Sequence, residues 1–192
     1  IGLPINKFVV ATNQNDILHR AITNGAYNVE NVAETISPSM DIQIASNFER
    51  LIFDLNDHSD KKTIDVMKSI KEKGKYTIQK ENLDKISVDF LSARIDENEI
   101  LNTIKSVYEK FDKVLDPHSA IGYRAFDKVK LKGNNIVLAT AHPCKFPDAI
   151  EKAINIKAEL PDELAFILDE KENYDIIDNN LDKIKKYIKE RI

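Results

Sequence analysis

Two short polar clusters supply the side chains best suited to chemistry, and each follows an apolar, β-branched run. The first run is Lys7–Ala11 and the second is Asn135–Thr140. Such runs are typical of buried strands, and ligands of open α/β sheets bind outside the carboxyl ends of the strands. We therefore expect both clusters to lie on one rim of a sheet and to bind a ligand there. They comprise Thr12, Asn13, Asn15 and Asp16 in the first, and Thr140, His142 and Lys145 in the second.

A purely structural role explains the same residues. The side-chain oxygen of Asn15 can cap the helix that follows, and Thr140 can simply end a strand. His142 can be a hydrogen-bonded residue that meets no ligand. Spacing alone favours this structural explanation over ligand binding.

Other kinds of site find little support in the sequence. The four histidines are scattered and there is a single cysteine, so no zinc-binding spacing occurs and no metal site is predicted. The five glycines form neither a G-x-G-x-x-G motif nor a phosphate-cradling lysine loop, which argues against a self-contained nucleotide site. Cys144 lies two residues from His142, but that spacing does not indicate a nucleophile facing its base.

Composition and charge narrow the class of protein. Of 192 residues, 42% are hydrophobic and 31% are charged, which is typical of one folded domain with a core. The net charge of -4, with both signs mixed, lacks the basic field that nucleic-acid binding requires. No apolar run is long enough to span a membrane, and we expect a cytoplasmic protein. The start at Ile1, without initiator Met or signal-peptide pattern, predicts a piece of a longer chain.

The elements that position the polar clusters are mainly helices. Helical spacing and capping signals predict helices at Asp16–Thr23, from Ser46, at Asp116–Gly133, from Pro147, and twice after Pro161. Residues 57–111, rich in Lys and Glu, are predicted to be solvated helices with one buried stripe, and residues 26–45 an ordered loop. The predicted fold class is α/β, a single helix-rich domain over residues 1–192 with two core strands.

Four segments, in order along the chain, resemble threonine synthase: ATNQNDIL (Ala11–Leu18), TISPSMDIQIASNFERLIFDL (Thr35–Leu55), DPHSAIGYRA (Asp116–Ala125) and ATAHPCKF (Ala139–Phe146). Residues 57–111 share no such likeness and are expected to be family-variable. The resemblance implies the carboxyl-terminal part of a tryptophan-synthase-β-like enzyme that uses pyridoxal 5'-phosphate. Its implied reaction converts O-phospho-L-homoserine and water to L-threonine and phosphate.

The resemblance also assigns roles to the two clusters. Thr140 is implied to meet the ring nitrogen of the cofactor with a neutral hydroxyl, which leaves that nitrogen largely unprotonated and moderates its pull on electrons. Asn13, Asn15 and His142 are implied to bind the cofactor, and Lys145 and Asp16 to bind the substrate. The loop from Ser37 to Asp41 is expected to close over the site.

The departures from the family pattern limit what the chain is expected to do alone. In the family, the Schiff-base lysine and the glycine-rich loop for the cofactor phosphate lie upstream of the strand at residues 7–11, and neither is in this sequence. We therefore expect no catalysis without the missing amino-terminal part, which would be a partner along with the substrate. Self-association is an alternative way to cover exposed strand edges. The alternative function is a non-catalytic interaction domain derived from the same family.

Overall fold

The computed structural model describes residues 3–192, which divide into two compact units. Unit 1 is Ile1–Glu159 and unit 2 is Leu160–Ile192. Unit 1 holds all the residues of the two predicted clusters. No helix among residues 3–192 has the length and apolar character needed to cross a bilayer.

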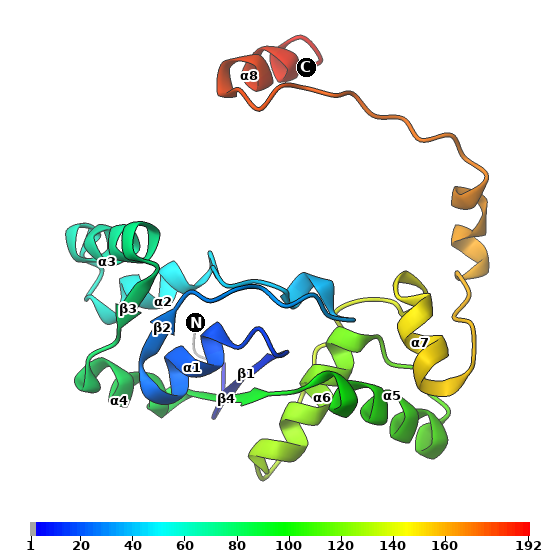
Figure 1. The fold of residues 1–192 in the computed structure, drawn as a ribbon, viewed down its shortest axis with the longest axis horizontal. Coiled ribbons are helices and arrows are strands. Elements are labelled where there is room, and N and C mark those ends of the chain that lie inside the picture. Colours follow the sequence, from blue (N-terminus) through cyan, green and yellow to red (C-terminus); the bar gives the residue numbers. More distant parts are fainter. Residues whose placement is uncertain (1–2) are drawn as a thin grey trace. The chain divides into compact units, whose positions relative to one another are not determined.

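A two-stranded parallel sheet lies at the centre of unit 1 (Figure 1). Strand β1 (Phe8–Thr12) pairs with β4 (Phe90–Arg94), so that Phe8 lies opposite Phe90 and Thr12 opposite Arg94. Successive side chains of a strand point to opposite faces. Accordingly, Val10 packs against one hydrophobic core, while Val9 and Ala11 pack against another. The alternating apolar residues of β1 therefore tie the two cores together.

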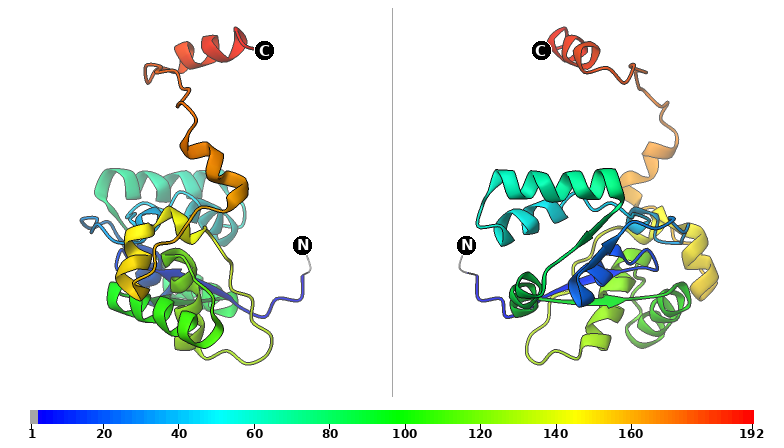
Figure 2. Two further views of the ribbon diagram at one scale, coloured as in Figure 1. Left: turned by 90° about the vertical axis from the view of Figure 1, so that its right-hand side faces the viewer. Right: turned by 60° about the vertical axis from the view of Figure 1, so that its left-hand side comes forward.

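The first core is built from the elements between β1 and β4. They are α1 (Ile17–Asn24), β2 (Ala26–Asn28), α2 (Phe48–Leu55), α3 (Asp60–Lys73), β3 (Lys75–Thr77) and α4 (Lys80–Asp89). Figure 2 shows α3 running alongside α2. The buried ring of Tyr27 stacks on Phe48 at 4.9 Å between centroids, and its hydroxyl accepts from Ala45 N–H at 2.9 Å. Burial accordingly raises the pKa of Tyr27.

Gly25 ends α1 in a conformation that favours glycine. Its φ of 76° lies in the left-handed region, as is common at the residue after a helix. A Cβ at this position would also lie 2.8 Å from the carbonyl oxygen of Ile78. The close passage from α1 into β2, paired antiparallel with β3, therefore depends on this glycine.

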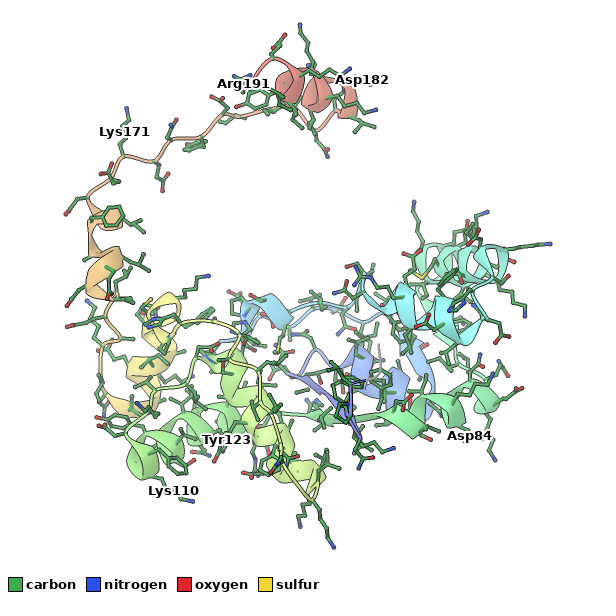
Figure 3. The ribbon with its side chains drawn as sticks, turned by 180° about the vertical axis from the view of Figure 1, so that it is seen from behind. Asp84, Lys110, Tyr123, Lys171, Asp182 and Arg191 are labelled. Carbon is green, nitrogen blue, oxygen red and sulfur yellow. The ribbon has the colours of Figure 1, made fainter. Side chains whose placement is uncertain are left out.

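The second core is built by helices that follow β4. They are α5 (Glu97–Phe111), α6 (Pro117–Val129) and α7 (Pro147–Ile154). The 3-10 turn η2 (Pro143–Lys145) directly precedes α7, and Met40 of the earlier 3-10 turn η1 (Pro38–Met40) packs against the same core. Asp96 and Glu99 form a capping box at the start of α5. Figure 3 shows Asp84 of α4 and Lys110 of α5 extending outward at opposite ends of unit 1.

Unit 2 contains η3 (Asp162–Leu168) and α8 (Leu181–Lys189). Asn180 caps α8 by accepting from the N–H groups of Asp182 and Lys183, and Figure 3 shows Asp182 and Arg191 at the two ends of this helix. None of the described side chains in this unit is buried. The described side chains of this unit therefore form no buried core, and the single domain over residues 1–192 stays a prediction.

The fold class is confirmed, and most helices form where the sequence predicts them. The prediction for Asn135–Thr140 is wrong, because these residues form no strand and are exposed. An apolar, β-branched run becomes a strand only where another backbone is available for pairing. The second core strand is instead β4, within the 57–111 segment that the sequence predicts as helical. The capping signal at Ser46 is also not realised, since α2 begins after Asn47 with no side-chain cap.

Candidate functional site

The polar cluster after β1 is organised around the carboxylate of Asp41. Its Oδ1 accepts from Asn13 Nδ2 at 2.7 Å, from Asn15 Nδ2 at 2.9 Å and from the Thr35 hydroxyl at 2.7 Å. Its Oδ2 accepts from the Thr35 N–H at 2.8 Å. Asn13 also donates to the hydroxyl of Ser37, which is fully buried. The cluster therefore holds the loop around η1 against the end of β1.

The side chain of Asn15 holds the same loop by bonding to the backbone of Ala33. Its Oδ1 accepts from the Ala33 N–H and its Nδ2 donates to the Ala33 carbonyl, both at 2.8 Å. The side-chain amide thus pairs with Ala33 as a strand residue would. No side-chain hydrogen bond caps α1, so the capping role that the sequence offers for Asn15 is wrong. Asn13 and Asn15 are 1% and 3% exposed, and the observed bonds use the polar atoms of both amides. Their contact with a cofactor stays a prediction.

Asp16 lies beside two arginines. Its carboxylate accepts from Arg20 Nε at 2.8 Å and forms an ion pair with Arg94, whose Nε lies 3.4 Å away. Arg20 also donates to the Asn28 carbonyl at 2.9 Å and pairs with Glu30. Asp16 therefore links α1 to β4 electrostatically. Its predicted contact with the substrate stays a prediction, and this carboxylate already has two cationic partners.

The second polar cluster has a different setting, because its three side chains are exposed. Thr140 follows the extended segment 135–139, and its N–H donates to the Ser119 hydroxyl at 3.0 Å. Nδ1 of His142 accepts from the Cys144 N–H at 3.3 Å and so caps η2. Lys145 lies in η2 and forms no ion pair within residues 3–192. The outer ring nitrogen of His142 and the ammonium of Lys145 are thus available for a ligand.

The start of α6 connects the two clusters, which share no direct hydrogen bond among the described residues. On one side, the Ser39 N–H of η1 donates to His118 Nε2 at 3.2 Å. On the other side, Ser119 contacts Thr140, with 3.4 Å between the two hydroxyl oxygens. Asp116, buried to 1% exposure, binds both His118 and Ser119. The predicted rim is therefore one connected network, although only one of its two clusters follows a strand.

His118 is held in one tautomer by this network. A backbone N–H donates to Nε2, so Nε2 carries the lone pair and the ring proton lies on Nδ1, 3.1 Å from Asp116 Oδ1. The ring also packs against Phe146 at 4.7 Å between centroids. The ring thereby links α6 to Ser39 of η1 and to Phe146, which follows η2.

Asp116, His118 and Ser119 belong to this network, although the sequence predicted only the start of a helix and a family-like segment at these positions. The signal was present in Asp116-Pro117-His118-Ser119, because a carboxylate, an imidazole and a hydroxyl within one turn exceed what a cap requires. Nothing in the spacing indicated that this turn meets Thr140, which lies 21 residues further along the chain.

The donor set suits an organic cofactor with an unprotonated ring nitrogen. Among residues 3–192 no group of three His, Cys, Asp or Glu side chains lies close enough to hold a metal ion. The exposed Thr140 hydroxyl faces only another hydroxyl, and the buried Thr12 hydroxyl has no hydrogen-bond partner within the described chain. A neutral hydroxyl that is free to rotate matches an unprotonated ring nitrogen, because it can donate without requiring a charge on the partner. Thr140 therefore fits the role predicted for it.

Comparison with known proteins gives consistent matches along the chain. The family model described as "Threonine synthase, C-terminal" matches residues 119–188. The threonine synthase of Pseudomonas aeruginosa is 37% identical over 191 residues, covering 98% of this chain and 41% of the relative. The chain is related to the carboxyl-terminal part of threonine synthase. It spans about two fifths of the length of such relatives.

Solved threonine synthases resemble this chain in fold as well as in sequence. The pyridoxal-phosphate-bound threonine synthase of Brucella melitensis superimposes with a TM-score of 0.86 at 41% identity, covering 98% of this chain and 41% of that one. The yeast threonine synthase gives 0.81 at 36% identity, over 98% of this chain and 42% of the yeast chain. The resemblance to threonine synthase drawn from four segments is confirmed, and it extends through residues 57–111.

Proposed function

We propose that this chain forms one wall of the cofactor site of a pyridoxal 5'-phosphate-dependent threonine synthase, a carbon-oxygen lyase that acts on a phosphate ester. The reaction converts O-phospho-L-homoserine and water to L-threonine and phosphate. The observation that carries the proposal is the alignment of nearly the whole chain with a cofactor-bound threonine synthase at 41% identity. We propose the cytoplasm as the place where it acts.

When bound, the cofactor withdraws electrons from the substrate, while the protein supplies orientation and tuning. In this proposal the Thr140 hydroxyl donates a hydrogen bond to the ring nitrogen. Its own contact within the chain is a long one, to the Ser119 hydroxyl at 3.4 Å. His142 and Lys145 bring an imidazole and an ammonium from the same exposed segment to the cofactor or to the phosphate of the substrate. Asn13 and Asn15 hold the loop around η1, whose Ser39 N–H donates to His118, and so shape the opposite side of the site.

The remaining machinery is proposed to come from the part of the relatives that this chain does not span. A lysine that holds the cofactor covalently and a glycine-rich phosphate loop belong to that part in the resemblance drawn above. The exposed segment 135–139 supports association with further backbone, because an apolar extended run gains hydrogen bonds and loses exposed apolar area when it is paired. The chain alone is therefore expected to release no phosphate.

The proposal is tested in a polypeptide that contains this chain and has the full length of its relatives, which we call the full polypeptide. Bound cofactor should absorb visible light, and O-phospho-L-homoserine should release phosphate. Thr140→Val should shift the absorbance and lower kcat/KM about tenfold or more, since one hydrogen bond to the cofactor is lost. Thr103→Val is the matched control, because Thr103 is buried on α5 and its hydroxyl donates only to the Glu99 carbonyl.

Two results would count against the proposal. If the full polypeptide showed neither cofactor absorbance nor phosphate release, the non-catalytic interaction domain would replace it. If Thr140→Val and Thr103→Val behaved alike, the enzyme would stand but Thr140 would leave the cofactor site.

A further inference from the structure

The hydroxyl of Ser119 is placed between a buried carboxylate and Thr140. Ser119 is 3% exposed on the first turn of α6, and its hydroxyl donates to Asp116 Oδ2. The same oxygen accepts from the Thr140 N–H at 3.0 Å and lies 3.4 Å from the Thr140 hydroxyl. One serine side chain therefore contacts both the backbone and the hydroxyl of Thr140.

Capping of α6 does not account for this hydroxyl. Asp116 Oδ1 accepts from the His118 N–H at 2.9 Å and from the Ser119 N–H at 3.4 Å, two N–H groups at the helix start that have no acceptor within the helix. The other oxygen, Oδ2, is directed to the hydroxyl of Ser119. Helix formation would proceed without that second bond, so its effect lies in the orientation of the serine hydroxyl.

The position of the serine proton decides how Thr140 can bond. A hydroxyl has one proton and two acceptor lone pairs. Because the proton of Ser119 lies toward Asp116, its oxygen can only accept from Thr140. The Thr140 hydroxyl can then donate in two ways. It can form a long bond to the Ser119 oxygen, or it can point its proton outward to another acceptor. The N–H bond keeps the residue in place in either case.

We infer that Ser119, oriented by Asp116, is a positioning residue that fixes Thr140 and keeps the Thr140 hydroxyl acting as a donor to the bound cofactor. This inference rests on the proposed function. It adds a group that touches neither cofactor nor substrate and that acts through Thr140. Within the described residues the segment 135–140 forms no strand, and Ser119 makes the side-chain contacts to Thr140.

The first test reports on the contact without the cofactor. Ser119→Ala removes the acceptor of the Thr140 N–H, and the amide of Thr140 should then exchange with solvent several-fold to tenfold faster by hydrogen-exchange NMR. Ser92→Ala is the matched control, since Ser92 is a half-buried serine of β4 whose hydroxyl donates to the Val10 carbonyl. An unchanged exchange rate for Thr140 would overturn the inference at its structural step.

The second test uses the full polypeptide loaded with pyridoxal 5'-phosphate labelled with ¹⁵N in the ring. Ser119→Ala should move the ring ¹⁵N chemical shift in the same direction as Thr140→Val, and kcat/KM should fall several-fold. In a Thr140→Val background, Ser119→Ala should add no further ¹⁵N shift, because the group through which it acts is gone. Asp116→Asn should give a smaller shift, and the hydroxyl-retaining Ser119→Thr should restore the wild-type value.

The outcomes separate this inference from the function on which it rests. If wild-type protein binds no cofactor, the proposed function fails, whereas the amide exchange result for Thr140 still stands or falls by itself. If Thr140→Val moves the ring ¹⁵N shift and Ser119→Ala does not, the function holds and the positioning role is overturned. Additive shifts in the double variant would likewise overturn it. Thermal unfolding of each variant, compared with Ser92→Ala, shows whether a loss reflects folding.

Discussion

The runs Phe8–Thr12 and Asn135–Thr140 have similar sequences and different structures. Both are short, apolar and β-branched, and both lead into polar residues. The first pairs with β4 and packs against two cores, while in the second Ile136 is 89% exposed and Leu138 74% exposed. The difference shows that a strand is a property of a pair, since the pattern gives the tendency and a neighbouring backbone gives the structure.

The same contrast holds for the polar residues that follow each run. After β1, the side chains of Asn13 and Asn15 are buried and bind a carboxylate of their own chain. After residue 139, Thr140, His142 and Lys145 are exposed, with Ser119 as the main support. One cluster shapes the site through internal bonds, and the other presents free groups.

The largest expected difference between the two runs comes from placing a charge in each. Val10→Asp puts a carboxylate against the first core and should lower the free energy of unfolding by about 3 kcal/mol or more. Ile136→Asp, at an exposed position, should change it by less than about 0.5 kcal/mol. Chemical denaturation of the chain measures both. Equal losses would mean that residues 135–140 are paired within this chain.

The two polar clusters should also differ when a charged member is removed. Asp41→Ala removes the carboxylate that accepts from the buried amides of Asn13 and Asn15 and from Thr35, and it should cost about 2 kcal/mol of unfolding free energy. Lys145→Ala removes an exposed ammonium and should cost almost nothing. Thermal unfolding checks the pair. A stable Asp41→Ala variant would show that the loop around η1 does not depend on the carboxylate.

A smaller effect concerns Glu99, which holds the helix that supports Thr140. Burial raises the pKa of Glu99, but hydrogen bonds from Lys128 and the Asp96 N–H, together with the charge of Lys128 and a bond from Arg124, lower it below its ordinary value of 4.5. A carboxyl group whose pKa is lowered in the native state stabilises the fold at pH values above its ordinary pKa. That stability is lost as the pH falls through the native pKa. Glu99→Gln should therefore cost about 1 kcal/mol at pH 7 and less near pH 3.

Denaturation of wild type and Glu99→Gln at both pH values measures this difference. Glu109→Gln is a control, because Glu109 forms an exposed pair with Lys105 on the same helix. The same loss in both variants, or a loss that grows as the pH falls, would contradict a native pKa below the ordinary one.

The smallest effect tests how firmly residues 135–140 are held. A Cβ at Gly122 of α6 would lie 3.2 Å from Val137 Cγ1, so Val137 must move by a few tenths of an ångström. Alanine also favours a helix interior over glycine by about 0.5–1 kcal/mol. Because segment 135–140 is unpaired in this chain, Gly122→Ala should stabilise it by about 0.5 kcal/mol. In the full polypeptide a paired segment cannot shift, and the same change should be neutral or destabilising.

Several elements of this protein followed from local sequence alone. Asp116-Pro117 placed the start of α6, and the glycines at 25 and 74 placed the ends of α1 and α3, because caps and left-handed residues act within one turn of chain. The charged segment gave its helices by amphipathic spacing. The polar residues of the site were also visible, although their roles as ligand contacts remain predictions.

Tertiary structure decided the rest. β4 was missed because it follows a helix directly and gains its strand structure from 82 residues away, through pairing with β1. Residues 135–140 form no strand because no backbone within residues 3–192 pairs with them. The side chain of Asn15 bonds to the backbone of Ala33 instead of capping α1. The turn at Asp116–Ser119 reached Thr140 through contacts across 21 residues. Sequence determined what each segment could form, and the partners available in space determined which of those structures was formed.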